Sequence, residues 1–297
     1  MRVAILGCGY VGLELGRRLA EDHAVVGVRR SEAGLEAVEA AGLQAVRADL
    51  TDAEDLERIP DADWLVFAAS SGGRDAEAAR TIYVDAQRRV IEHFGGRADS
   101  PARYCYTSST GVYGDHDGAW VDESTDLAPA TEKTRVLATA EDVALEAAEA
   151  GMAPTVARLA GIYGPDRYRL ERYLVGPVTP GYLNMVHRDD AAGAVAHCLA
   201  DDDAAGEVVL VVDDEPVDRW DFADWLAAAC DEPEPPKQTV AERLESGDVS
   251  ERAERRLRTD KRCSNAKLRG LGYDFAYPTY REGYRPAVAA YRADSSG

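Results

Sequence analysis

The sequence predicts an α/β fold: a doubly wound parallel sheet with a smaller, partly discontinuous C-terminal lobe. Two observations support this prediction. Short apolar runs alternate with helical patterns through the first half of the 297-residue chain, as in sheets whose parallel strands are joined by helical crossovers. The second half is less regular, with an acidic, proline-rich linker at residues 231–236 and a charge-dense helix expected at 242–258.

The first expected element is a strand at residues 3–6, an unbroken apolar run, and a helix follows from Tyr10 with apolar residues at Leu13, Leu15 and Leu19. Similar runs predict further strands at residues 24–28, 43–48, 64–69, 102–108, 155–162 and 208–212. Helical spacing predicts helices at residues 32–41, which Ser31 caps, and at 76–94, 134–150 and 189–199. In such sheets, ligands bind at the carboxyl ends of the strands.

Gly7, Gly9 and Gly12 form a G-x-G-x-x-G turn between the first strand and the first helix. In a dinucleotide-binding turn the first glycine permits the sharp bend, the second lets a pyrophosphate approach the backbone, and the third lets helix and strand pack closely. The helix N-terminus, with Tyr10 and Val11 in the loop, then faces the phosphates. The alternative is an ordinary turn between a strand and a helix, because glycines also occur there.

This turn identifies the predicted sheet as one of the Rossmann type. Residues 1–165 and 184–213 are expected to form the dinucleotide-binding domain. Residues 166–183 and 214–297 then remain for a substrate-binding lobe.

The end of the second strand distinguishes the two nicotinamide dinucleotides. An acidic residue there bonds the ribose 2′-hydroxyl of NAD(H), whereas an arginine accommodates the 2′-phosphate of NADP(H). Arg29 and Arg30 occupy this place, with no acid before Glu32. Two guanidinium groups can grip a phosphate, so NADP(H) is favoured and NAD(H) stays possible. The alternative is that both arginines form surface ion pairs.

The charge of the chain limits its partners. It carries 54 acidic and 34 basic residues, for a formal net charge of −20, which argues against nucleic acid or an anionic membrane surface as the main partner. No apolar run reaches the roughly 18 residues of a membrane span, and no secretory signal precedes the first strand. A small-molecule substrate is the expected partner.

The cysteines indicate the compartment. They are scattered, odd in number and without the spacing of metal ligands: Cys8, Cys105, Cys198, Cys230 and Cys263. Free thiols are typical of a reducing environment, so the sequence predicts a cytoplasmic protein without a metal site.

Acid-rich, lysine-poor composition also resembles that of proteins from salt-accumulating halophiles, and the lysines here are only Lys133, Lys237, Lys261 and Lys267. At about 1 M salt the Debye length is about 3 Å, so self-repulsion is screened. We hypothesise a halophilic protein whose melting temperature rises with KCl. Melting curves that fall as KCl rises would reject this in favour of an ordinary acidic protein.

Several segments in a fixed order resemble the extended and atypical short-chain dehydrogenase/reductases, in particular the NAD(P)-dependent epimerase/dehydratase family. They are the glycine turn, Asp49-Leu50-Thr51-Asp52, residues 108–114 (Ser-Ser-Thr-Gly-Val-Tyr-Gly), residues 158–165, residues 184–190, residues 264–268 and residues 271–283. The resemblance covers nearly the whole chain.

The resemblance implies a set of site residues. Ser109 would hydrogen-bond the substrate carbonyl or hydroxyl, although serines after a strand also serve as turn residues. The other implied residues are Asp49 near the adenine with Leu50 beside it, Ala68 and Ala69 near the adenosine ribose, Tyr163 at the nicotinamide end, and Asn184 and His187 on the substrate side. His187 taken alone is equally compatible with a structural role.

One departure from the family limits the prediction of catalysis. The family uses Tyr-x-x-x-Lys, in which the tyrosine is the general acid/base and the lysine lowers its pKa. Here Thr131 and Arg135 stand at those places, and an aliphatic hydroxyl is far too weak an acid to replace a phenol. Tyr113, Tyr163 or a water held by Ser109 are the alternative proton donors.

Three functions therefore remain open. The first is an NADP(H)-dependent epimerase/dehydratase-like oxidoreductase acting on a carbonyl or carbinol, with a sugar nucleotide as a substrate suggested by the fold alone. The second is a non-catalytic NADP(H)-binding redox sensor or scaffold, and the third a nucleotide-binding fold without a surviving ligand. The resemblance also implies a homodimer through the helices at 76–94 and 134–150.

Overall fold

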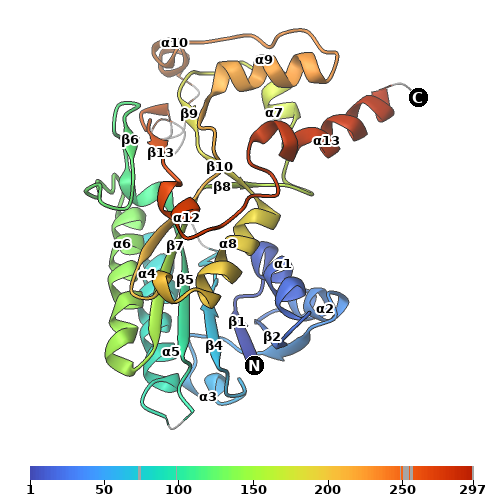
Figure 1. The fold of residues 1–297 in the computed structure, drawn as a ribbon. Helices are drawn as coiled ribbons and strands as arrows, with labels where there is room; N and C mark the ends of the chain where they lie inside the picture. Colours follow the sequence, from blue (N-terminus) through green and yellow to red (C-terminus); the bar gives the residue numbers. More distant parts are fainter. Residues whose placement is uncertain (73–74, 98, 248, 250–253, 255–256, 296–297) are drawn as a thin grey trace.

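The computed structural model describes residues 1–297 except 73–74, 98, 248, 250–253, 255–256 and 296–297. Its centre is a sheet of seven parallel strands in the order β11-β7-β5-β4-β1-β2-β3 (Figure 1). The strands are β1 (Arg2–Leu6), β2 (Ala24–Arg29), β3 (Gln44–Arg47), β4 (Trp64–Phe67), β5 (Arg103–Ser109), β7 (Ala153–Leu159) and β11 (Val208–Val211). The predicted doubly wound parallel sheet is confirmed.

Helices cover both faces of the sheet because inner strands such as β1 are apolar on both sides. In β1, Val3 and Ile5 pack with the core under α1 and α8, whereas Ala4 and Leu6 pack with the core under α5 and α6. The first layer holds α1 (Tyr10–Leu19), α2 (Glu32–Ala40) and α8 (Arg188–Ala200). The second layer holds α3 (Ala53–Leu56), α4 (Ala76–Arg80), the π-helical segment η1 (Thr81–Ala86), α5 (Gln87–Phe94) and α6 (Glu132–Leu145).

Several expected elements differ in detail from the structure. The helix expected at 134–150 begins at Glu132 and continues as a 3-10 helix after Leu145. The helix expected at 76–94 is present, but η1 interrupts its α-helical hydrogen bonding. The strand expected at 155–162 ends at Leu159, and β8 (Gly161–Tyr163) leaves the central sheet to pair with β10 (Met185–His187). The chain turns out of the sheet here because it crosses from the sheet into the second lobe.

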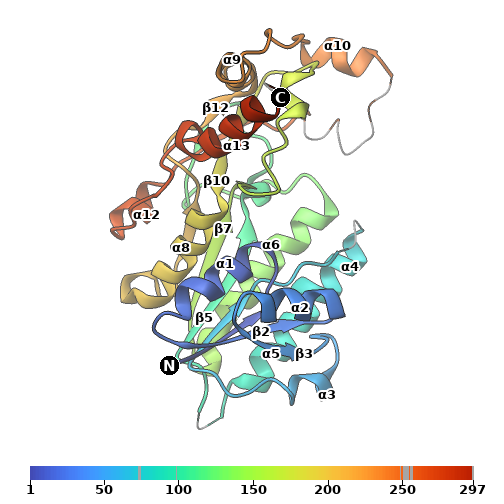
Figure 2. The same cartoon turned by 90° about the vertical axis from the view of Figure 1, so that its right-hand side faces the viewer.

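The second lobe lies above the sheet in both ribbon views, with α9, α10 and α13 at its top (Figures 1 and 2). Its elements are α7 (Glu171–Leu174), β9 (Tyr182–Leu183), β12 (Val217–Asp218), α9 (Arg219–Ala229), α10 (Val240–Glu245) and α13 (Tyr280–Ser295). An aromatic core that includes Phe222, Tyr280 and Tyr284 holds it together. The helix expected at 242–258 is not continuous: α10 ends at Glu245, and Gly247, with a φ of +73°, follows. Residues 248, 250–253 and 255–256 of the expected helix lie outside the described residues.

The C-terminal segment returns from the second lobe to the sheet. Leu268 and Tyr273 belong to the same core as α1 and α8, so part of residues 214–297 packs against the sheet domain. The remaining elements are β6 (Trp120–Val121), β13 (Arg262–Cys263), α12 (Ala266–Gly270), and the short 3-10 helices η2 (Thr110–Tyr113), η3 (Glu146–Ala150) and η4 (Asp202–Ala204). The division into domains by residue number stays a prediction.

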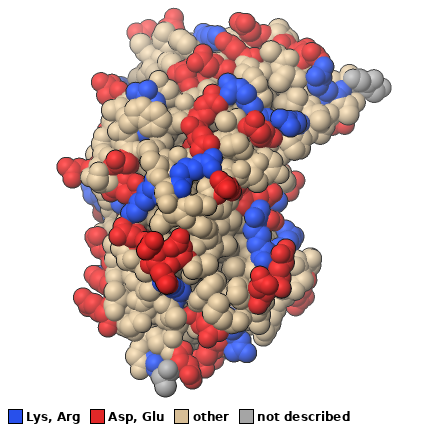
Figure 3. All heavy atoms as spheres, in the orientation of Figure 1, with Lys and Arg blue, Asp and Glu red and all other residues tan. Residues whose placement is uncertain are grey.

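The structure shows where the many acidic side chains lie and what state the five cysteines are in. Acidic side chains lie over both lobes on the face drawn in Figure 3, with basic side chains between them. All five cysteines are free and buried. Within the described residues, no helix has the length and apolarity to cross a membrane, and no group of three or more His, Cys, Asp or Glu side chains is placed to hold a metal.

Candidate functional site

A cleft of about 570 Å³ opens at the carboxyl ends of β1, β2 and β4, where the strand order reverses between β1 and β4. Ligands of open parallel sheets bind at such a reversal. The cofactor residues expected from the sequence that line the cleft are Gly7, Gly9, Tyr10, Val11, Gly12, Arg29, Arg30, Asp49, Leu50, Ala68 and Ala69. Its volume is in the range of small-molecule and cofactor sites, about 300–1,000 Å³.

The glycine turn forms an open cradle at Gly9. Gly7 has a φ of +84°, and a Cβ there would lie 2.3 Å from Ala69 Cα, so only glycine fits. A Cβ at Gly9 would meet only the Arg29 Nη1 atom closely, at 2.9 Å. At Gly12 a Cβ would lie 3.1 Å from Ile5 Cγ2, because helix and strand pack closely. The backbone at Gly9 is therefore accessible to a pyrophosphate at the N-terminus of α1.

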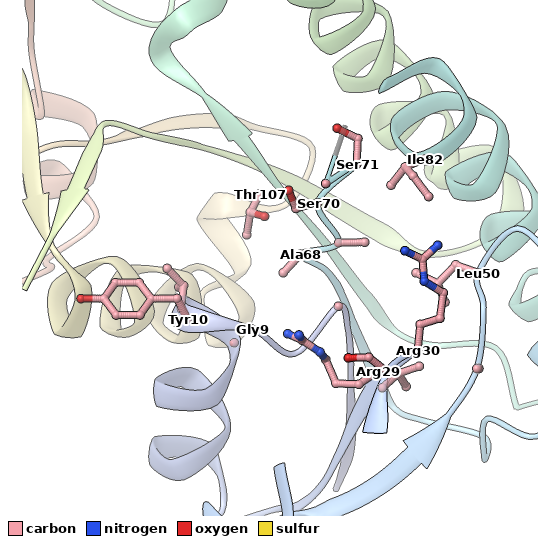
Figure 4. Close-up of a pocket in the computed structure, with 18 of the residues that line it drawn as sticks. Gly9, Tyr10, Arg29, Arg30, Leu50, Ala68, Ser70, Ser71, Ile82 and Thr107 are labelled. Carbon is pink, nitrogen blue, oxygen red and sulfur yellow. The ribbon is translucent and has the colours of Figure 1, made fainter. Parts of the chain in front are cut away.

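Arg29 and Arg30 lie at the end of β2 on the cleft wall (Figure 4). Arg29 reaches across to the glycine turn, where its Nη1 donates to the Cys8 carbonyl oxygen at 3.1 Å. Arg30 is exposed, and its Nη1 lies 3.5 Å from Asp49 Oδ2. Burial raises the pKa of Asp49, but hydrogen bonds from Thr51 and the charge of Arg30 outweigh it and lower that pKa. Of the two arginines, only Arg30 pairs with an acid.

Two arginines approach the other end of the cleft at Tyr10, Arg167 from the second lobe and Arg188 from the start of α8. The Arg167 guanidinium lies 4.0 Å from the Tyr10 ring centroid, and that of Arg188 lies 5.5 Å from it. The Tyr10 hydroxyl donates to the Pro165 carbonyl oxygen at 2.6 Å, and burial raises its pKa. Tyr10 therefore anchors the second lobe to the glycine turn.

Ser109, Thr131 and Arg135 lie outside the cleft lining. Ser109 ends β5, and its Oγ accepts a hydrogen bond from the Gly111 amide at 3.2 Å. Thr131 caps α6, where its Oγ1 accepts from the Thr134 amide at 3.0 Å. Arg135 is exposed and pairs with Glu132 at 3.0 Å. Thr131 and Arg135, which stand at the Tyr-x-x-x-Lys positions, are therefore both engaged in contacts at the start of α6.

Tyr113 is buried behind the site. Its hydroxyl donates to the Asp122 carbonyl oxygen at 2.7 Å and accepts from Arg158 Nη1 at 2.6 Å. Burial raises its pKa, against the nearby charge of Arg158. Arg158 in turn pairs with the buried Glu141, to which Ser108 donates. This network holds the loop that follows β5.

The expected nicotinamide and substrate residues lie under the second lobe. Tyr163 is buried and stacks on Tyr284 with ring centroids 4.8 Å apart. Asn184 bridges to β13, accepting from the Cys263 amide at 2.6 Å. His187 is buried and caps α8, and its Nδ1 accepts from the Asp189 amide at 3.2 Å. None of the three lines the cleft, whereas Ile162, the neighbour of Tyr163, does.

Sequence reasoning missed several residues that line the cleft. They include Ser70 and Ser71 after β4, Ile82 in η1, Thr107 in β5, and Arg167 in the second lobe. The two serines directly follow Ala68 and Ala69 at the carboxyl end of a predicted strand, so position alone could have identified them. Nothing local in the sequence signals Ile82 or Arg167, because the packing of distant segments places them.

Comparisons with known proteins agree with this arrangement. The model of a family described as "NAD dependent epimerase/dehydratase family" matches residues 3–210, more than half of the chain. A search of curated proteins found no match.

Solved structures show the same fold along the whole chain. A functionally unknown conserved protein from Silicibacter pomeroyi is 29% identical, with a TM-score of 0.77, over 99% of this chain and 98% of that chain. The UDP-glucuronic acid 4-epimerase of Bacillus cereus is 16% identical, with a TM-score of 0.77 and 99% of each chain covered. A dTDP-glucose 4,6-dehydratase from Streptomyces venezuelae, solved with NAD bound, is 20% identical, with a TM-score of 0.76, over 100% of this chain and 98% of that chain.

Proposed function

Because the chain belongs to the NAD dependent epimerase/dehydratase family, we propose that its cleft binds a nicotinamide dinucleotide, NADP(H) in preference to NAD(H). The observation that carries the proposal is the open cradle at Gly9 at the N-terminus of α1. Gly9 has no side chain of its own, only the end of the Arg29 side chain lies close to its Cβ position, and the dipole of α1 favours a phosphate there.

The preference for NADP(H) rests on the end of β2. Arg29 and Arg30 lie where the ribose 2′-substituent of a dinucleotide would be held, and Ser31 lines the cleft beside them. Asp49, an acid that lines the cleft beside them, is already paired with Arg30. A 2′-phosphate would meet two guanidinium groups, whereas a 2′-hydroxyl would find its acidic partner engaged.

The reaction that this site fits is hydride transfer to or from a carbonyl or carbinol carbon. The dinucleotide, when bound, supplies or accepts the hydride. Ser109 would orient the substrate oxygen from the end of β5, and Arg167, which lines the cleft, would attract an anionic group from the side of the second lobe. The structural neighbours named for UDP-glucuronic acid and dTDP-glucose make a sugar nucleotide the first substrate class to test.

A non-catalytic NADP(H) sensor or scaffold is the second candidate. The local bonding of Thr131 and Arg135 favours it, because neither side chain reaches the cleft lining. The two functions differ in one observation: an oxidoreductase consumes bound NADPH when its substrate is added, and a sensor does not. With either function, we expect a cytoplasmic protein that forms a homodimer through α4, α5 and α6.

Replacing Arg30 by alanine should weaken NADPH binding by roughly 10- to 100-fold and leave NADH binding unchanged. The reason is that a charge-assisted hydrogen bond to the 2′-phosphate contributes roughly 1.5–3 kcal/mol. Titration followed by nucleotide fluorescence measures both affinities. Arg58→Ala is the matched control, since Arg58 is also exposed and paired with an aspartate but lies outside the cleft lining. Equal weakening of NADPH and NADH by Arg30→Ala would contradict the assignment.

A further inference from the structure

Tyr83 lies directly behind the cleft wall, in the π-helical segment η1. Its hydroxyl oxygen accepts a hydrogen bond from the Ser71 amide at 3.3 Å. Ser70 and Ser71 line the cleft, as does Ile82, the residue before Tyr83 (Figure 4). π-Helical turns are rare and occur frequently at functional sites. The phenol is therefore one hydrogen bond away from groups that a bound ligand would touch.

Tyr83 differs in acidity from the other tyrosines. Burial raises its pKa, but hydrogen bonds with Ser71 and Ser70 and the charge of Lys133 outweigh burial, and its pKa is lowered. Every other tyrosine of the described chain with a shifted pKa has it raised. A hydroxyl that gives up its proton more readily is what acid–base chemistry near neutral pH requires.

Among the described residues, Lys133 and Tyr106 are the titratable groups whose charges interact with Tyr83. Lys133 comes from the first turn of α6, which packs against η1, and it also acts on Asp75, the residue that caps α4. Tyr106 faces Tyr83 from β5, but burial raises its pKa, so it stays protonated. Lys133 therefore adds a charge to the larger effect of the hydrogen bonds with Ser71 and Ser70, and both lower the pKa of Tyr83.

We propose that Tyr83 and Lys133 form the acid–base pair of this cleft, in place of the missing Tyr-x-x-x-Lys pair, with Ser70 and Ser71 passing the proton between Tyr83 and the substrate oxygen. Tyr83 comes from η1 and Lys133 from α6, whereas the two residues of Tyr-x-x-x-Lys lie one turn apart on a single helix. This inference rests on the proposed oxidoreductase function.

The protons balance as follows in the reducing direction. The substrate carbonyl carbon receives hydride from a dihydronicotinamide, and its oxygen takes the proton of a serine hydroxyl. That serine takes the proton of Tyr83, and the Lys133 ammonium and the Ser71 amide stabilise the resulting phenolate. A solvent proton then restores the phenol. In the oxidising direction each transfer is reversed, and Tyr83 ends with the proton of the substrate hydroxyl.

The test is a pH titration of the tyrosines by ultraviolet absorbance or by NMR of ring-labelled tyrosine, on the full chain without nucleotide. Tyr83→Phe should remove the tyrosine that ionises at the lowest pH. Lys133→Met should move that ionisation to higher pH, the direction expected when a nearby opposite charge is lost. Lys237→Met and Tyr291→Phe, at a surface lysine and a surface tyrosine away from the cleft, should leave it unchanged.

The titration is then repeated with NADP⁺, whose pyridinium charge should lower the ionisation pH of Tyr83 further than NADPH does. An ionisation that Lys133→Met leaves in place, or one that bound NADP⁺ does not move, would overturn the acid–base pair while nucleotide binding stands. If nucleotide fluorescence detects no binding of either dinucleotide, the proposed function fails, and the proton path fails with it.

Discussion

Replacing Arg158 by methionine is expected to lower the free energy of unfolding by about 3–5 kcal/mol, because it leaves the charge of Glu141 buried without its partner. The side chains of Arg158 and Glu141 are only 6% and 4% exposed, and their closest atoms lie 2.7 Å apart. Arg158 also donates to the Tyr113 hydroxyl, so the loop after β5 loses a second contact.

Urea unfolding followed by circular dichroism measures this effect. Arg58→Met is the matched control, because the exposed Arg58–Asp55 pair should contribute less than about 1 kcal/mol. The double variant Arg158→Met/Glu141→Leu should recover most of the loss, since it removes both buried charges. If Arg158→Met lowers the free energy of unfolding no more than Arg58→Met does, the Arg158–Glu141 pair does not stabilise the fold in the way proposed.

Replacing Gly9 by alanine is expected to leave the fold intact and to weaken dinucleotide binding by about 100-fold or more. A Cβ at Gly9 meets only the mobile end of Arg29 in the protein, but it stands where the pyrophosphate must approach. Losing two charge-assisted hydrogen bonds at roughly 1.5–3 kcal/mol each gives an effect of this size.

Gly7→Ala is the matched control for this prediction. Its Cβ would lie 2.3 Å from Ala69 Cα on a backbone with a φ of +84°, so it should destabilise the fold itself. Thermal melting separates the two variants, and nucleotide fluorescence measures their binding. If the Gly9→Ala protein binds the dinucleotide as tightly as the unmodified chain does, the glycine turn is not part of the binding site.

The sheet and the part of the cleft around the glycine turn could be predicted, because both depend on residues that are close together in the sequence. A buried parallel strand is a continuous apolar run, and the residues that follow it lie at the carboxyl edge whatever the rest of the chain does. Gly7, Arg29 and Ala68 could therefore be placed from their positions after β1, in β2 and after β4.

The substrate side was not predictable in this way. Tyr163 and His187 were expected at the ligand, but their burial depends on how the second lobe covers β8 and β10. Tyr83 and Lys133 were not recognised, because their proximity requires a π-helical turn in one helix and the first turn of another. The π turn has no signal in the spacing of apolar residues, which reads through 76–94 as one helix.

The most direct test of the central claim is a titration of the unmodified chain with NADPH and, separately, with NADH in molar KCl, followed by nucleotide fluorescence. We expect NADPH to bind roughly 10- to 100-fold more tightly than NADH, because Arg29 and Arg30, which line the cleft, would meet the 2′-phosphate. NADH binding as tight as that of NADPH would contradict the role of the two arginines. Binding of neither nucleotide would contradict the dinucleotide site as a whole.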